Sequence, residues 1–290
     1  MAITAALVKE LRERTGSGMM DCKKALTETS GDIEAAIDLM RASGAAKAAK
    51  KAGRIAAEGL VSFKLSADGK SGSIIEINSE TDFVSKSDDF INFVADLNDL
   101  ALEAKSVDIE AFNTQKLADG RDIETAREDI VGKIGENVSV RRTAFLEGST
   151  VAGYQHGERI GVLVSLEGGD ASLAKDIAMH IAASKPECIS EAELSSDLIE
   201  REKAVFTEQA RESGKPDEII EKMIVGRMKK FINEVCLVGQ PFVKDPETTV
   251  GKLLKDKGAS ITTFVRYEVG EGIEKAVDNF VEEVMAQAKG

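Results

Sequence analysis

The sequence predicts an α+β fold, and three changes of pattern along its 290 residues support that prediction. Apolar residues first recur at helical spacing, then alternate with polar residues as strands do, and later return to helical spacing in a long stretch. A strand followed by an amphipathic helix also recurs after roughly 88 residues, which favours two similar α/β subdomains. A chain of this length is expected to form several packed units rather than one core.

Residues 1–54, called the head below, are predicted to form three short helices and a linker. Glycine-containing breaks separate the helices, and Asp32 is placed to cap the third one. The helices are expected over residues 4–14, 18–29 and 32–40, and the Ala- and Lys-rich run 45–53 is expected to be a helical or flexible linker. The apolar residues predicted for the small head core include Leu7, Leu11, Met19, Leu26, Ile33, Ala36, Ile37 and Met40.

Residues 55–140 are predicted to be the first subdomain of the core. Val61, Phe63 and Leu65 alternate with polar residues, and the turn at Asp68-Gly69 joins them to a second strand in a hairpin. The remaining elements expected here are the strand 73–78, helices over 88–103 and 123–134, and the beginning of a strand over 138–146.

The second subdomain is predicted to comprise residues 141–186 and 234–269, with residues 187–233 inserted as an antiparallel helical hairpin. Its expected elements are strands over 151–154, 160–166 and 261–269 and helices over 170–183 and 249–256. The hairpin is indicated by two apolar stripes, Leu194, Leu198 and Val205 in one helix and Ile220, Met223, Ile224, Met228 and Phe231 in the other. The hairpin either projects from the body or packs flat on it. Residues 270–290 are expected to form a C-terminal helical module, with a helix over 273–288.

Composition points to a soluble cytoplasmic protein that does not bind nucleic acid directly. The net charge is -13, which opposes sequence-independent binding to phosphates. The head carries ten Lys or Arg against seven Asp or Glu, so the head is basic on an acidic body, which indicates either a docking surface or a solvated helical face. The sequence predicts no signal peptide and no membrane span. The three cysteines are too widely spaced in the sequence to predict a disulfide framework.

Motifs for catalysis, metal binding or phosphate binding are not found. A phosphate-binding loop would need glycine where Lys64 stands before Gly69-Lys70-Ser71, so that segment is expected to be a hairpin turn. His156 and His180 lack the partners of a metal site or a catalytic triad. No catalytic residue, metal ligand or cofactor is therefore predicted.

The segment 79–87 is the most informative one, because an aromatic residue stands in a polar connection between a strand and a helix. An exposed Phe83 would be a candidate binding anchor. Residue physics alone favours the alternative, in which Asp82 caps a turn and Phe83 folds into the core.

Several motifs together resemble the bacterial elongation factor Ts family, essentially from end to end. They are residues 8–12 (Val-Lys-Glu-Leu-Arg), 15–26 (beginning Thr-Gly-Ser-Gly-Met-Met-Asp-Cys), 81–84 (Thr-Asp-Phe-Val), 133–137 (Lys-Ile-Gly-Glu-Asn), 154–157 (Tyr-Gln-His-Gly) and 239–242 (Gly-Gln-Pro-Phe). The resemblance implies a ubiquitin-associated-like (UBA-like) head, a core of two α/β subdomains, an inserted antiparallel coiled coil and a C-terminal helical module.

The resemblance also implies a function, that of a guanine-nucleotide exchange factor in translation elongation. The implied partner is elongation factor Tu, in its GDP-bound and nucleotide-free forms. The factor would promote GDP release by disturbing the partner's magnesium and phosphate site and would stay bound until GTP binds. Nucleic acid and membranes are not implied as partners, and self-association through the helical hairpin is left open.

The site residues implied by the resemblance fall into two sets. Thr81, Asp82, Phe83 and Val84 would intrude near the partner's magnesium, which reverses the preference for a buried Phe83. Further contacts are implied for Arg12, Met19, Met20, Lys23, Lys51, Ile134, Gly135 and His156, although Met19 and Met20 could instead fill the head core.

Two other classes of function remain as rivals. A scaffold or ubiquitin-like-binding adaptor would bind a partner without changing its nucleotide release. An enzyme that uses a carboxylate pair or Cys188 would turn over a small substrate by itself, and the missing histidine and glycine-rich constellations weigh against it.

Overall fold

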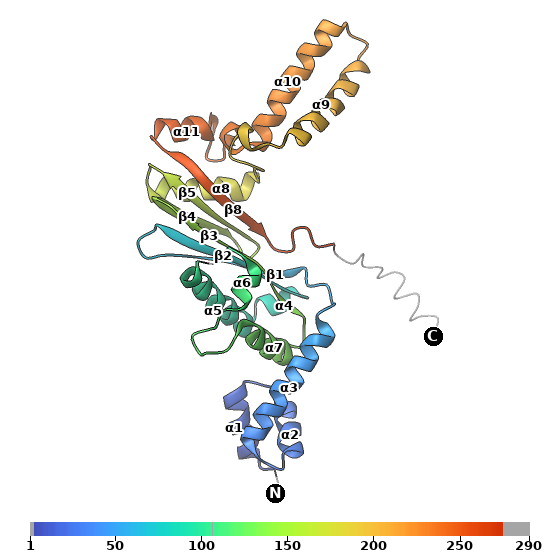
Figure 1. Ribbon diagram of the computed structural model, residues 1–290, viewed down its shortest axis with the longest axis vertical. Helices are drawn as coiled ribbons and strands as arrows, with labels where there is room; N and C mark the ends of the chain where they lie inside the picture. Colours follow the sequence, from blue (N-terminus) through green and yellow to red (C-terminus); the bar gives the residue numbers. More distant parts are fainter. Residues whose placement is uncertain (1–2, 106, 275–290) are drawn as a thin grey trace, which may run out of the picture.

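The computed structural model describes residues 3–105 and 107–274 of the chain. The molecule is elongated, with the head at one end, two three-stranded sheets in the middle and the helical hairpin at the other end (Figure 1). The mixture of helices and antiparallel sheets confirms the predicted α+β class. None of the helices within the described residues is long and apolar enough to span a bilayer.

The head contains α1 (Ala5–Thr15), α2 (Met19–Glu28) and α3 (Ile33–Lys51), and the first half of α3 packs with α1 and α2. Thr4 and Asp32 cap α1 and α3 with their side chains, and Gly16 ends α1 in the left-handed conformation. The prediction that the third helix ends at Met40 is wrong. Apart from Gly44, the residues that follow are mostly Ala and Lys, which are strong helix formers, so α3 continues to Lys51.

The second half of α3 packs on α7 (Ile123–Ile134) and so attaches the three-helix part of the head to the body. A Cβ atom at Gly132 of α7 would stand 3.1 Å from the Cα atom of Gly44, so the two helix backbones cross in close contact. One turn further along α3, Ala48 is completely buried in the core of the body. One helix therefore contributes to the cores of both the head and the body.

The first sheet is antiparallel in the order β1-β2-β3, and helices α5 and α7 pack against it. The core between sheet and helices contains Ile75 and Ile77 of β2 together with Phe90 and Leu97 of α5. The elements not yet given are β1 (Glu58–Leu65), β2 (Ser71–Ser79), α4 (Asp82–Ser85), α5 (Asp88–Ala104), α6 (Ile109–Asn113) and β3 (Val138–Glu147).

The second sheet is antiparallel in the order β4-β5-β8, and its core is formed with α8 and α11. Its elements are β4 (Thr150–His156), β5 (Ile160–Glu167), α8 (Ala171–Ser184), α11 (Val250–Asp256) and β8 (Ser260–Glu268), with a short ribbon of β6 (Pro241–Phe242) and β7 (Asp245–Thr249) nearby. In the first sheet the middle strand β2 leads through α4 to α5, and in the second sheet the middle strand β5 leads through a turn to α8.

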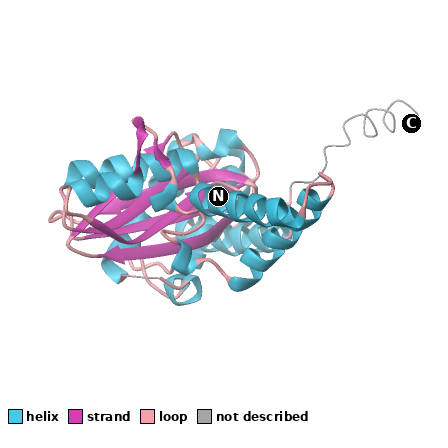
Figure 2. Ribbon diagram, turned by 90° about the horizontal axis from the view of Figure 1, so that it is seen from above, coloured by secondary structure: helices cyan, strands magenta, loops and turns pink. Residues whose placement is uncertain are grey.

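The two sheets pack face to face, with helices on both outer sides (Figure 2). Val61 and Ile74 of the first sheet meet Leu163 of the second sheet in the core between them. Glycines make the close approach feasible: a Cβ atom at Gly161 would lie 2.5 Å from a methyl carbon of Val61.

The helical hairpin consists of α9 (Ser196–Arg211) and α10 (Asp217–Val235), preceded by a short 3-10 helix at Glu191–Glu193 and followed by another at Leu237–Gly239. Ala210, Ile220 and Ile224 are buried between its helices, and the rings of Phe206 and Phe231 meet edge to face. The prediction that Val205 belongs to the inner stripe is wrong, since its side chain is 43% exposed. The hairpin projects from the body, as Figure 1 shows.

The predicted C-terminal helix over 273–288 lies, except for its first two residues, outside the residues that the structure describes. Three residues before the end of the described chain, Glu271 forms ion pairs with Arg142 and Lys185. Beneath this contact, the completely buried Glu76 is paired with Arg141 at 2.9 Å and with Arg142 at 2.5 Å. This charge cluster joins the first sheet to the end of the described chain.

Candidate functional site

Helix α4 presents Phe83 to solvent on a firmly attached base. Phe83 is 83% exposed, whereas its neighbours Val84 and Ser85 are buried. The Ser85 hydroxyl donates to the Asp82 carbonyl at 2.9 Å, and the Ser87 hydroxyl donates to the Val84 carbonyl at 2.7 Å. The alternative in which Phe83 folds into the core is therefore wrong: Val84, one position further along the helix, occupies the inward position.

The chain before α4 is held by two carboxylates. Glu136 accepts a hydrogen bond from the Thr81 amide at 2.9 Å and another from the Thr81 hydroxyl at 2.7 Å. The Glu80 carboxylate accepts a hydrogen bond from the backbone amide of Asn137 at 2.6 Å and lies 3.5 Å from the guanidinium of Arg54. These bonds tie the entrance of α4 to the loop after α7, so the direction in which Phe83 projects is fixed by the body.

Asp82 opens α4 and does not cap it, which corrects the capping alternative. Its carboxylate forms an exposed ion pair with Lys86 at 2.7 Å. This hydrogen bond, and then the charge of Lys86, lower the pKa of Asp82, and Arg159 adds to the effect. Asp82 is thus ionised at neutral pH and available to a cation or a hydrogen-bond donor of a partner.

A groove of about 510 Å³, called the head groove below, lies between the head and α4. It brings together three segments that are far apart in the sequence: the α1–α2 turn, α4 and the end of α7. The residues that line it are Arg12, Gly16, Ser17, Gly18, Met19, Phe83, Val84, Ser87, Asp89, Lys133 and Ile134. Five of the residues implied by the resemblance, Arg12, Met19, Phe83, Val84 and Ile134, are therefore neighbours around one groove.

The head adds an exposed apolar surface next to Phe83. Met19 is 60% exposed and Met20 is 74% exposed, at the N-terminus of α2. The prediction that Met19 fills the head core is wrong, because Cys22, Ala25 and Leu26 occupy the inner side of α2. Arg12 and Lys23 are also exposed, so basic and apolar side chains share this end of the head.

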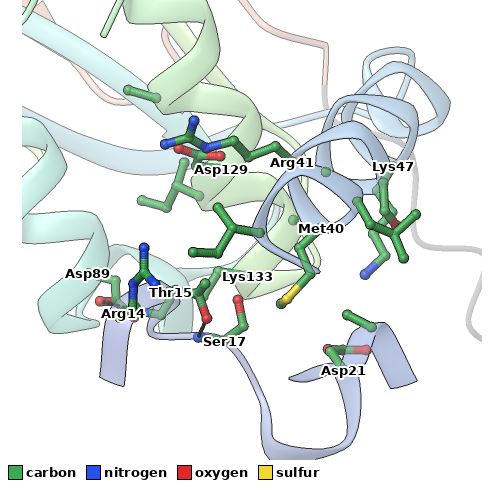
Figure 3. Close-up of a pocket in the computed structure, with 18 of the residues that line it drawn as sticks. Arg14, Thr15, Ser17, Asp21, Met40, Arg41, Lys47, Asp89, Asp129 and Lys133 are labelled. Atoms are coloured by element: carbon green, nitrogen blue, oxygen red, sulfur yellow. Dashed lines mark hydrogen bonds and ion pairs between the residues drawn. The ribbon is translucent and has the colours of Figure 1, made fainter. Parts of the chain in front are cut away.

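Two lysines lie where α3 meets the body, Lys51 at the end of α3 and Lys133 near the end of α7. The Lys51 ammonium donates to the carbonyl of Gly135, at the end of α7. Lys133 forms an ion pair with Asp89 at 2.6 Å. Lys133 also lines a larger cleft of about 650 Å³ between head and body, where Arg14, Met40 and Arg41 of the head lie near Asp89 and Asp129 of the body (Figure 3).

His156 does not line the head groove. It lies exposed at the end of β4, and its ring stacks with Tyr154 at 6.4 Å between centroids. The turn that follows leads to Arg159, which is close enough to Asp82 to lower the pKa of that carboxyl. Lys23 likewise lies outside the groove, so these two residues are not part of the same cluster.

Comparisons with known proteins identify the family. The family model described as "Elongation factor TS" matches residues 80–271. The chain is 64% identical to the elongation factor Ts of Ruthia magnifica subsp. Calyptogena magnifica over 100% of this chain and 99% of the relative. The factor of Alkalilimnicola ehrlichii is also 64% identical, over the full length of both chains. The factor of Legionella pneumophila is 56% identical over 99% of each.

The chain belongs to the elongation factor Ts family. The predicted resemblance is confirmed, and with it a place among the translation elongation factors. The family match begins at Glu80, directly before the segment that holds α4, whereas the similarity to the relatives includes the head as well.

The other histidine of this elongation factor Ts family member, His180, lies in the interior of the protein. His180 is completely buried on α8, its Nε2 atom lies 3.0 Å from the side-chain oxygen Oε1 of Gln240, and its Nδ1 atom accepts from the backbone amide of Val243. Burial lowers its pKa. Within the described part of the chain, no group of three or more His, Cys, Asp or Glu side chains is placed to hold a metal ion.

Sequence reasoning missed the residues that support the site, namely Glu80, Glu136, Lys133 and Asp89. A signal was present, because residues 133–137 were recognised as one motif. What the motif does structurally, which is to end α7 at Gly135 and to place Glu136 under Thr81, depends on a contact between residues 55 positions apart.

Proposed function

We propose that this chain is a guanine-nucleotide exchange factor that binds GDP-bound elongation factor Tu, promotes GDP release and stays bound to the nucleotide-free partner until GTP binds. The observation that carries the proposal is the exposed Phe83 on a helix clamped at the edge of the head groove. A large aromatic side chain that is exposed on a rigid base is suited to insertion into a partner.

The proposed mechanism is a wedge. Oriented backbone amides and magnesium neutralise the phosphates of a bound nucleotide, so a displacement of either weakens nucleotide binding. Phe83 would be the apolar wedge, and the ionised Asp82 beside it would compete for groups near the magnesium. Thr81 and Val84 would hold the wedge, the first through Glu136 and the second through the core.

Docking of the head would position the wedge. Met19 and Met20 offer exposed apolar surface, while Arg12 and Lys23 offer positive charge on a head that is basic overall. Ile134 would border the contact, and Lys51 would keep Gly135 in place. We assign His156 a contact near the phosphate-binding loop of the partner, because its turn lies on the same side of the body as Asp82.

The factor would need no catalytic chemistry of its own. Factor and nucleotide would oppose each other's binding to the same partner, and thermodynamic linkage makes that opposition reciprocal, so GTP binding would expel the factor. We place this activity in the cytoplasm, without a cofactor and without direct contact to nucleic acid or membrane. A UBA-like head, a coiled-coil hairpin and self-association through the hairpin belong to the same proposal.

The test is release of a fluorescent GDP analogue from purified elongation factor Tu, with and without this chain. Strong acceleration by the unaltered chain, lost in a variant that combines Asp82→Ala with Phe83→Ala, supports the proposal. Circular dichroism checks that the variant is folded. A stable complex by gel filtration without any acceleration would instead support the scaffold function.

A further inference from the structure

Two cysteines meet at the root of the helical hairpin, far from α4. The chain leaves the body near Cys188 and returns to it at Cys236, directly after α10. The two residues form an isolated parallel bridge. Hydrogen bonds from the Glu187 amide to the Val235 carbonyl and from the Leu237 amide to the Cys188 carbonyl, both 2.9 Å, hold the two segments together.

The side chains of this pair face each other. Their sulfur atoms are 3.4 Å apart, and both thiols are free. A disulfide has an S–S bond of about 2.05 Å and joins residues whose Cα atoms lie roughly 4.4–6.8 Å apart, a separation that paired neighbouring strands provide. Closing the bond therefore requires a side-chain movement of little more than 1 Å and leaves the backbone pairing in place.

The surroundings of the two thiols make them slow to react at neutral pH, and each thiol has only the other as a partner for a disulfide. Cys188 is 8% exposed and Cys236 is 2% exposed. Burial, then the hydrogen bond between the thiols, raise the pKa of Cys188 to about 12, and the carboxylates of Glu193 and Glu187 contribute. Burial also raises the pKa of Cys236, to which Glu191 adds. Among the three cysteines, Cys22 lies alone in the head core, so it has no thiol partner within the chain.

We propose that Cys188 and Cys236 are an oxidative modification site, at which a hydroperoxide converts the two thiols into an intramolecular disulfide. One thiolate attacks the hydroperoxide, the O–O bond breaks, and a sulfenic acid and a hydroxide or alkoxide ion result. This ion takes up the proton that the thiol released and becomes water or an alcohol. The second sulfur then attacks the sulfenic sulfur, the S–O bond breaks, and water leaves with the second thiol proton. The two thiols lose two electrons in total, which the hydroperoxide accepts.

The disulfide closes a covalent ring around the whole hairpin. Both chain connections between the hairpin and the body pass through the pair, so the bond fixes the root from which α9 and α10 project. Because the head lies at the opposite end of the molecule and α4 lies in the half of the body nearer the head (Figure 1), the effect of oxidation is confined to the hairpin end.

The experiment exposes the full chain to hydrogen peroxide, unfolds it in denaturant and counts the free thiols. We expect two of the three thiols to disappear, the mass to fall by two hydrogen atoms, and a protease digest to contain a peptide pair linked through residues 188 and 236. Cys22→Ser should form the same linkage, whereas Cys188→Ser should not form any disulfide within the chain.

A second measurement tests the clamp at the root. Hydrogen–deuterium exchange of the amides of Glu187, Leu237 and Val238 is expected to slow on oxidation and to recover with a reductant. Retention of all three thiols after a treatment that oxidises a free cysteine peptide would overturn the proposal, as would a linkage that includes Cys22. Unchanged exchange in a chain that carries the disulfide would overturn the clamp.

Discussion

The side chains of α4 divide into anchors and a projecting group. Val84 and Ser85 turn inward, while Phe83 turns outward and keeps most of its surface in water. Exposure of a large aromatic side chain forgoes the roughly 1.5–3 kcal/mol that its burial would contribute to folding. The bonds between Thr81 and Glu136 allow the helix to keep this orientation without help from the ring itself.

His180 provides a pH-dependent contribution to stability. Burial lowers its pKa below the usual value of about 6.5, so the unfolded chain takes up a proton at higher pH than the folded chain. The stabilisation from neutral His180 is therefore complete above about pH 6.5 and is lost as the pH falls from there through the lowered pKa.

We expect the melting temperature of the unaltered chain to fall more steeply than that of His180→Gln between about pH 7 and pH 5. Thermal unfolding followed by circular dichroism at several pH values measures both slopes. Equal slopes in the two proteins would show that His180 does not cause the dependence.

Residue-scale predictions succeeded where a local pattern fixes the answer and failed where a distant contact does. The N-cap of α3 at Asp32 and the end of α1 at Gly16 follow from the local sequence. The exposure of Met19 does not, because its place in the core is taken by Cys22 and Leu26. The meeting of Cys188 and Cys236 depends on how the hairpin is inserted, which their spacing in the sequence does not reveal.

The crossing of α3 and α7 sets the position of the head. Glycine inside a helix costs up to about 1 kcal/mol relative to alanine, so a pair of glycines facing each other needs a structural reason. Here the reason is contact between the two backbones at Gly44 and Gly132. Since α7 ends beside Thr81 and α3 carries the head, this crossing determines the width of the head groove.

Gly132→Val is expected to lower the free energy of unfolding by about 1–3 kcal/mol, as is usual for overpacking. Gly226→Val on α10 is the matched control, because a Cβ atom there meets nothing within 4 Å. That variant is expected to stay within about 0.5 kcal/mol of the unaltered chain. Chemical denaturation measures both values, and a similar effect at the two positions would show that the crossing has room for a side chain.

Elements were predicted well where periodicity was strong and less well where it was interrupted. The strands of both sheets and the two hairpin helices lie close to their predicted positions. The third head helix was cut short at Met40 because its continuation lacks an apolar stripe and contains Gly44. Its actual length follows from packing on α7 and burial of Ala48, neither of which is a local property.

At the scale of the whole molecule, the proposed partner-binding surface and the helical hairpin lie in different parts of the molecule. The basic head lies at one end, the hairpin lies at the other, and α4 lies in the half of the body nearer the head (Figure 1). The two sheets between them share an interior of interlocked side chains, and Glu76 with its arginines ties the end of the described chain to that body. A body of this kind keeps the head and α4 in a constant relation while a partner is engaged.

The most direct test of the wedge is a titration of GDP release from elongation factor Tu, in which the saturating rate and the half-saturating concentration are measured separately. Phe83→Ala is compared with Val225→Ala, which truncates another exposed apolar side chain, 69% exposed on α10. We predict that Phe83→Ala lowers the saturating rate by about tenfold or more, corresponding to at least roughly 1.4 kcal/mol of transition-state stabilisation, while Val225→Ala leaves it unchanged. An unchanged saturating rate for Phe83→Ala, with or without a higher half-saturating concentration, would contradict the wedge mechanism. Phe83 would then be only a docking contact.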